Sequence, residues 1–169
     1  ADIFGGSAAS PTSARFHHFT RRPALTFTPR AALMLYAGYA EGYNSGGVAR
    51  LTEPDPATGE NVTFLYPYAP ENIHNYELGL RSDWLDERVR LNATLFHTKW
   101  QGIQLAGAAP DPFNPGRYLQ RTLTSNVAAA RAQGLEVELR ARPAAGWDVD
   151  LNVGLLDTAY TEVSPLTGD

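Results

Sequence analysis

The sequence has no cysteine, no long apolar run and no strong excess of charge of either sign. Without cysteine, both a disulfide framework and a thiolate metal site are excluded. No run approaches the roughly 18 apolar residues that a membrane-spanning helix needs. Residues 1–19 lack a basic region followed by an apolar core, so we expect an internal piece of a longer chain rather than a signal peptide.

The composition is that of a folded protein. Of the 169 residues, 43% are hydrophobic and 19% are charged, which is ordinary for a globular domain. The formal net charge of -4 gives no electrostatic reason to expect nucleic acid as a partner.

Apolar and polar residues alternate most clearly between positions 134 and 160. Every second residue of 135–141 is apolar, and Glu136, Glu138 and Arg140 lie between them. The same period of two recurs over 147–155, after a short connection at 143–146. The pattern predicts an antiparallel hairpin with one apolar and one charged face.

Similar patterns predict further strands over 19–28, 33–40, 75–84 and 89–95, and one that begins near Asn126. The expected connections alternate in length: 29–32, 85–87 and 143–146 are short, whereas 42–73 and 106–125 are long and irregular. Three prolines, Pro110, Pro112 and Pro115, exclude a ladder strand from the second long stretch.

This alternation in length favours a membrane barrel. In an antiparallel meander alternate connections lie at the same end, and outer-membrane barrels have short periplasmic turns and long extracellular loops. Aromatic residues at both ends would form the interfacial girdles, with Trp84 and Trp147 at one end. At the other end we expect Tyr39, Tyr43, Trp100 and Tyr160. The alternative is a soluble β-sandwich that serves as a binding or adhesion module.

Several blocks resemble the barrel of TonB-dependent outer-membrane receptors. They include YAGYAEGYNSGG at 36–47, NYELGLRS at 75–82, GLEVE at 134–138 and GLLDTAY at 154–160. The resemblance spans about residues 19–161. One departure is the sequence FTRRP at 19–23, where the family usually has FTPR, because it places a proline deeper in the first strand.

The resemblance implies an all-β fold, an antiparallel up-and-down meander that supplies about six strands of a 22-stranded transmembrane barrel. Residues 1–169 would be part of the barrel domain, without the plug domain and the C-terminal strands. It also implies the outer membrane of a Gram-negative bacterium and energy-coupled uptake of a scarce nutrient, most commonly a ferric siderophore. The implied partners are membrane lipid, the receptor's own plug and the inner-membrane protein TonB, with no cofactor.

The period of two assigns each strand residue to a face. We expect lipid to contact Val89, Leu91, Leu135, Val137, Leu139, Val149, Leu151 and Val153. We expect the lumen to be lined by Glu77, Arg81, Arg90, Glu136, Glu138, Arg140, Asp148 and Asp150. On this basis Leu151→Arg impairs barrel assembly, whereas Asp150→Ala does not.

No catalytic or metal site is predicted. The histidines, His17, His18, His74 and His97, lack zinc-site spacing, and Ser45 lacks the strand-to-helix elbow of a nucleophile. The acidic residues Glu53, Asp55 and Glu60 lack the pattern of a calcium loop. Ligand contact is instead expected from the long loops, where aromatic rings and a cation suit a bulky anionic iron chelate. The candidates are Tyr43, Asn44, Tyr66, Tyr68 and Arg117.

Overall fold

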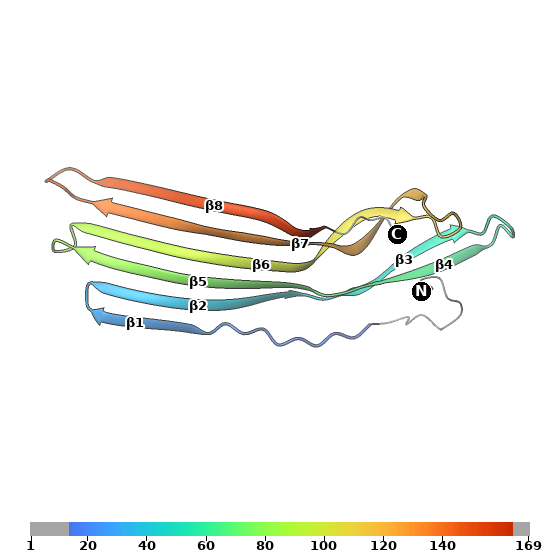
Figure 1. The fold of residues 1–169 in the computed structure, drawn as a ribbon, viewed down its shortest axis with the longest axis horizontal. Helices are drawn as coiled ribbons and strands as arrows, with labels where there is room; N and C mark the ends of the chain where they lie inside the picture. The colour runs from blue at the N-terminus through green and yellow to red at the C-terminus, as the bar shows by residue number, and fades with distance from the viewer. Residues whose placement is uncertain (1–13, 164–169) are drawn as a thin grey trace.

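The computed structural model describes residues 14–163, which form antiparallel strands. Six strands make one sheet in the order β1-β2-β5-β6-β7-β8, and β3 and β4 form a separate hairpin (Figure 1). Their bounds are β1 Ala24–Arg30, β2 Leu33–Asn44, β3 Gly47–Pro54, β4 Asn61–Tyr68, β5 Glu71–Trp84, β6 Val89–Pro110, β7 Tyr118–Ala141 and β8 Val149–Val163. The predicted all-β, up-and-down meander is confirmed. No helix among the described residues is long and apolar enough to cross a membrane.

The connections separate into two ends of the sheet. Residues 31–32, 85–88 and 142–148 join strands at one end, which we call the short-turn end (Figure 1). At the opposite end, which we call the long-loop end, the β3–β4 hairpin lies between β2 and β5, and the turn 111–117 joins the extended ends of β6 and β7. Because the strands of the sheet are antiparallel, alternate connections return to the same end. The short connections therefore gather at one end and the long ones at the other.

Both stretches expected to be irregular contain strands. The stretch 42–73 holds the β3–β4 hairpin, and most of 106–125 belongs to β6 and β7, so β7 begins at Tyr118 and not near Asn126. The prolines do not exclude strands here, because they lie at the turn: Pro110 is the last residue of β6, and Pro112 lies in the turn 111–117. A proline at these positions removes no N–H from the interior of the ladder.

The first and last strands also differ from prediction at their starts. β8 begins at Val149, so Trp147 lies in the preceding connection. β1 begins at Ala24, but the carbonyls of Pro23 and Arg21 still accept hydrogen bonds of 3.0 Å from the N–H groups of Tyr39 and Glu41. Pro23 is tolerated because an edge segment needs only its carbonyl at this position.

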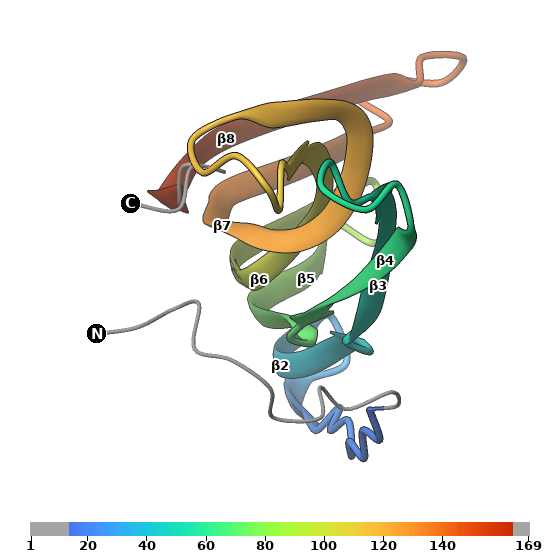
Figure 2. The ribbon, with the colours of Figure 1, turned by 90° about the vertical axis from the view of Figure 1, so that its right-hand side faces the viewer.

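The β3–β4 hairpin packs against the extended end of β7 (Figure 2). Leu51, Ala109 and Leu123 form a small buried cluster, and Phe64 and Tyr66 pack against it. An ion pair of 3.1 Å between Arg121 Nη1 and Glu53 Oε1 joins the same two elements. The loops at this end are therefore held together by a core of their own, whereas the six-stranded sheet is a single layer within the described residues.

Candidate functional site

One face of the sheet is apolar across every strand. The ladder aligns Leu91, Leu139 and Leu151 at one level, and Ala93, Val137 and Val153 at the next. Nothing in the described chain covers this face, and Leu151 is 53% exposed. An open apolar surface of this size marks contact with a partner or a membrane. A soluble sandwich would bury these residues under a second layer, which residues 14–163 do not form.

The opposite face carries the polar residues. All but one of the residues predicted to face the lumen share it: Glu77, Arg81, Arg90, Glu136, Glu138, Arg140 and Asp150. Arg140 Nε lies 2.9 Å from Asp150 Oδ1. The exception, Asp148, lies in the connection before β8 and forms an ion pair of 2.9 Å with Arg142. That this polar face lines a lumen stays a prediction.

A tyrosine ties three strands together on the polar face. The hydroxyl of Tyr36 on β2 hydrogen-bonds Thr94 Oγ1 on β6 at 2.8 Å, although β5 lies between the two strands. The ring crosses β5 at Gly79, where a Cβ atom would collide with it. Arg81 of β5 lies over the same ring, with its Cζ 5.8 Å from the centroid. The glycine therefore makes room for a polar cross-strand contact.

The aromatic girdles are only partly as predicted. Tyr39 packs against Tyr76 on the apolar face, with centroids 5.0 Å apart, and Trp84 is exposed at the short-turn end. Trp100 and Tyr160 lie on the polar face instead, because both are paired with Ala130, whose position has the polar parity. A girdle role for these two residues is therefore wrong.

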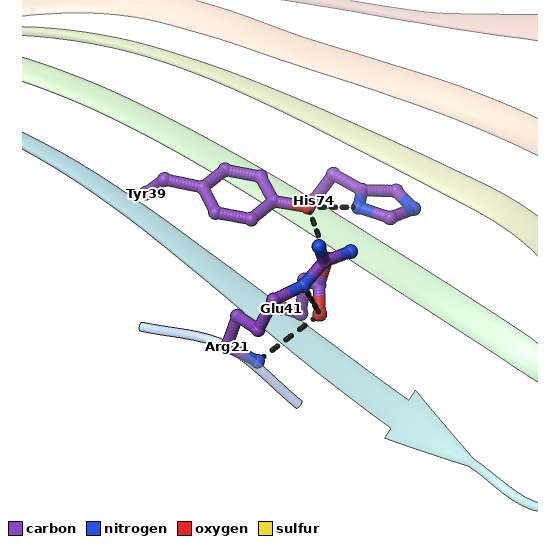
Figure 3. A network of polar contacts seen from close by, with 4 residues as sticks. All are labelled: Arg21, Tyr39, Glu41 and His74. Carbon is purple, nitrogen blue, oxygen red and sulfur yellow. Dashed lines mark hydrogen bonds and ion pairs between the residues drawn. The ribbon is translucent and has the colours of Figure 1, made fainter. Parts of the chain in front are cut away.

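The histidines have no partners that indicate a catalytic or metal site within the described residues, and three of them contact nearby side chains. His18 stacks on Tyr43 with the centroids 4.1 Å apart, and His97 Nδ1 lies 3.2 Å from Gln133 Oε1. His74 Nδ1 lies 2.8 Å from the hydroxyl of Tyr39. Beside this contact, Glu41 accepts hydrogen bonds from the Tyr39 hydroxyl and from Arg21 Nη2 (Figure 3). The two distances are 2.6 and 2.9 Å.

The acidic residues of the first long stretch also have local roles. Glu53 pairs with Arg121, and Asp55 accepts a hydrogen bond of 2.8 Å from the N–H of Ala57, which closes a tight turn. Glu60 begins the return to β4, where its carbonyl accepts a hydrogen bond of 2.8 Å from the N–H of Asp55.

The five ligand candidates are not gathered in one place. Tyr43 has the parity of the apolar face and stacks on His18, and Tyr66 packs into the cluster of Leu51. Burial, and secondly the carboxylate of Asp111, raises the pKa of Tyr66. Tyr68 is half-buried over Gly47. These surroundings leave the three rings little freedom to meet a ligand.

Two of the candidates are exposed. Arg117 lies in the turn 111–117 at the tip of β6 and β7, and Asn44 ends β2. Asn44 Nδ2 donates a hydrogen bond of 3.3 Å to Gln104 Oε1. Arg117 also lowers the pKa of Asp111, after the larger effect of hydrogen bonds from Asn114 and Phe113. A ligand role for Arg117 and Asn44 stays a prediction.

One polar cluster, which we call the neck, lies where the β3–β4 hairpin leaves the sheet, and no sequence pattern predicts it. Asn126 of β7 accepts a hydrogen bond of 2.6 Å from the N–H of Ala69 and donates to the carbonyls of Ala69 and Gly102, at 2.9 and 2.7 Å. Gln104 donates to the carbonyls of Ser45 and Ala69, at 3.0 and 3.1 Å. The neck fixes both ends of the hairpin to β6 and β7. Asn126 is expected only at the start of a strand, and its residue type alone does not reveal this bonding.

A bulge in β6 makes the neck possible. Gly102 has a φ of +65°, and the β6–β7 register shifts between Trp100 and Ile103. A Cβ at Gly102 would approach the carbonyl oxygen of Pro70 to 2.8 Å. Only glycine combines the left-handed conformation with this close approach.

A two-faced sheet with short turns at one end and long hairpins at the other defines the class of transmembrane β-barrels. The model of one family, the TonB dependent receptor-like β-barrel, matches residues 2–168, and the chain belongs to that family. Members of this family are outer-membrane proteins of Gram-negative bacteria.

Individual relatives were found by sequence. The chain is 32% identical over 132 residues to the pesticin receptor of Yersinia pestis, covering 78% of this chain and 17% of the relative. It is 23% identical over 158 residues to the probable TonB-dependent siderophore receptor PiuA of Acinetobacter baumannii, covering 92% of this chain and 19% of the relative. The chain thus spans about a fifth of the length of these relatives.

Solved structures share the fold. The ferric yersiniabactin uptake receptor FyuA from Yersinia pestis matches with a TM-score of 0.56 and 26% identity, over 83% of this chain and 18% of that one. The alcaligin outer-membrane receptor FauA from Bordetella pertussis matches with a TM-score of 0.54 and 20% identity, over 89% and 24%. The predicted family is confirmed.

Proposed function

We propose that the protein to which this chain belongs is an outer-membrane receptor that binds a ferric siderophore or a similar iron complex and imports it. The observation that carries this proposal is the 26% identity to the ferric yersiniabactin uptake receptor FyuA, over 83% of this chain. The similarity to a probable siderophore receptor supports the same class of cargo.

The two faces of the sheet suit this function. In the proposal, hydrocarbon contacts the apolar face, and the polar face lines the lumen and contacts the receptor's own plug domain. A sheet with unlike faces separates lipid from a hydrated lumen in barrels of this kind. TonB supplies energy from the inner membrane through a region outside this chain. The role is binding and passage, and we assign no catalysis to it.

The proposed ligand-contacting surface is the exposed part of the long-loop end. Arg117 is the leading candidate there, because its guanidinium is exposed at the loop tip and a permanent cation suits an anionic chelate. The packed hairpins beneath it hold the turn in place, since Leu123 of β7 is buried against Leu51 of β3.

The test is iron uptake by the full-length receptor in a bacterium that lacks its own siderophore receptors. We expect uptake of radioactive iron from one class of ferric siderophore among catecholates, hydroxamates, carboxylates and phenolates, and loss of that uptake when TonB is deleted. Iron uptake that is independent of TonB, or uptake of none of these complexes by a receptor shown to be folded, would contradict the proposal.

The loop assignment is tested separately with the siderophore that this assay identifies. Arg117→Ala is expected to weaken its binding by roughly tenfold, the loss of about one charge-assisted hydrogen bond. The control is Arg50→Ala, which removes an exposed arginine from the outside of β3. Equal affinities of the two variants would remove Arg117 from the ligand contacts while leaving the uptake result intact.

A further inference from the structure

The apolar face ends, towards the long loops, in a row of charged residues. Along β6 the residues of this face are Leu91, Ala93 and Leu95, then His97 and Lys99. The ladder pairs Lys99 with His74 of β5 on one side and with Arg131 of β7 on the other. The row therefore lies on the outer side of the sheet, about 13 Å along the strand beyond the last aliphatic residue, at about 3.3 Å per residue.

Two cations stand directly opposite each other in this row. Lys99 and Arg131 are cross-strand partners in an uninterrupted part of the ladder, since the register of β6 and β7 shifts only beyond Trp100. Cβ atoms of such partners are about 5 Å apart, and like charges in that position destabilise a sheet unless an anion lies between them. This arrangement needs a counter-ion.

The described residues neutralise this pair incompletely. Arg131 Nη2 lies 3.4 Å from Asp157 Oδ2, but that carboxylate is 58% exposed and also accepts a hydrogen bond of 3.0 Å from Gln133. No hydrogen bond or ion pair is formed by Lys99 with any residue of 14–163, and its side chain is exposed. The other carboxylate in the row, Glu41, is already held by Arg21 and Tyr39 (Figure 3). Its side chain is only 4% exposed.

We propose that Lys99 and Arg131 bind a phosphate group of a phosphorylated glycolipid, the lipopolysaccharide of the outer leaflet, on the outside of the barrel. The inference rests on the proposed function, because that function places the apolar face in the membrane and the long loops outside the cell. Basic residues just beyond an apolar belt attract anionic lipid headgroups. Adjacent strands are about 4.8 Å apart, so both cations can reach the oxygens of one phosphate. The acyl chains of the same lipid would cover Leu95 and Leu155, which are 53% and 62% exposed.

The experiment compares lipid binding by the full-length receptor and two double variants in detergent. Lys99→Gln with Arg131→Gln removes the proposed phosphate ligands. Arg50→Gln with Arg142→Gln removes the same charge from the long-loop hairpin and from the short-turn end, away from this row. Heat-dependent gel mobility shows that each variant is a folded barrel before binding is measured.

The probes are fluorescent lipopolysaccharide, the same lipid with its phosphates removed, and vesicles of phosphatidylglycerol. We expect the wild type and the control variant to bind the phosphorylated glycolipid at least tenfold more tightly than the dephosphorylated one, and the Lys99 and Arg131 variant to lose that preference. Equal preference in both variants, or binding that ignores the phosphates, would overturn the proposal. Equally tight binding of phosphatidylglycerol vesicles would overturn the assignment to lipopolysaccharide.

Failure of this inference differs from failure of the proposed function. The lipid assay uses no iron complex and no TonB, and the iron-uptake assay does not depend on Lys99. A receptor that imports iron but shows no phosphate preference would contradict only the lipid site.

Discussion

The ring of Tyr36 occupies the space over Gly79, so that a tyrosine of β2 reaches across β5 to bond Thr94 of β6. A side chain at position 79 and the ring of Tyr36 exclude each other. The contact that links these three strands therefore depends on a glycine at position 79.

Gly79→Ala is expected to displace the Tyr36 ring and break its hydrogen bond to Thr94. Forcing a methyl group into an occupied space costs about 1–3 kcal/mol. The measurement is the guanidinium midpoint of unfolding of the full-length barrel in detergent. The control is Gly38→Ala in β2, on the same face, where a Cβ meets nothing within 4 Å. If both alanine substitutions shift the midpoint equally, the Tyr36 contact does not contribute to the stability of the barrel.

Asn126→Ala is expected to loosen the β3–β4 hairpin without disturbing the spanning strands. The change removes the three hydrogen bonds that Asn126 makes with the backbone of Ala69 and Gly102, while Gln104 still donates to the Ala69 carbonyl. The net loss is about 1 kcal/mol for each hydrogen bond. Hydrogen exchange should become about tenfold faster in residues 47–68 and stay unchanged in 89–95.

Asn61→Ala is the matched control for the neck, because Asn61 is an exposed asparagine of β4. Faster exchange throughout the sheet in Asn126→Ala would show that the neck stabilises the whole fold rather than the hairpin. Unchanged exchange would show that the hairpin does not depend on it.

The turn 111–117 is expected to open in acid. Asp111 accepts hydrogen bonds from the N–H of Phe113 at 2.9 Å and from Asn114, and these bonds lower its pKa below the ordinary 3.8. Because the folded pKa is the lower one, the stabilisation is complete above pH 3.8 and is lost as the pH falls through the lowered value.

Pepsin, which acts in acid, provides the measurement for Asp111. Cleavage next to Phe113 in the full-length receptor should rise as the pH falls below about 3.8, beyond the change in pepsin's own activity. In Asp111→Asn the same site should be cleaved at a rate that follows pepsin activity alone. Identical profiles for both proteins would contradict the role assigned to the carboxylate.

The strands of the six-stranded sheet can be predicted from the sequence, because the two-residue alternation of apolar and polar residues is visible within each strand. Between Asn75 and Leu155 the residues of the apolar face recur at every second position of each strand, so the faces can be assigned without knowing the neighbours. Parity also explains the error at Trp100. Nearness to the loops predicts a girdle position for Trp100, but counting from Leu95 puts it on the other face.

The long-loop end could not be predicted, because its order comes from contacts distant in sequence. Leu51 is buried against Ala109 and Leu123, and no local sequence pattern predicts that these three residues are in contact. Prolines gathered in one turn resemble prolines scattered through a loop when only composition is considered. The phosphate site depends likewise on the register that sets Lys99 opposite Arg131.

The central claim is that the apolar face contacts hydrocarbon, and adjacent residues of β8 test it with the same substitution. Leu151 pairs with Leu139 on the apolar face, whereas Asn152 pairs with Glu138 on the polar face. An arginine in lipid near the bilayer midplane costs about 2–4 kcal/mol. The measurement is the fraction of full-length receptor that folds into lipid vesicles, read from heat-dependent gel mobility. We expect Leu151→Arg to reduce that fraction strongly, and Asn152→Arg and Asp150→Ala to fold like the wild type. Equal folding of Leu151→Arg and Asn152→Arg would show that this face does not contact hydrocarbon.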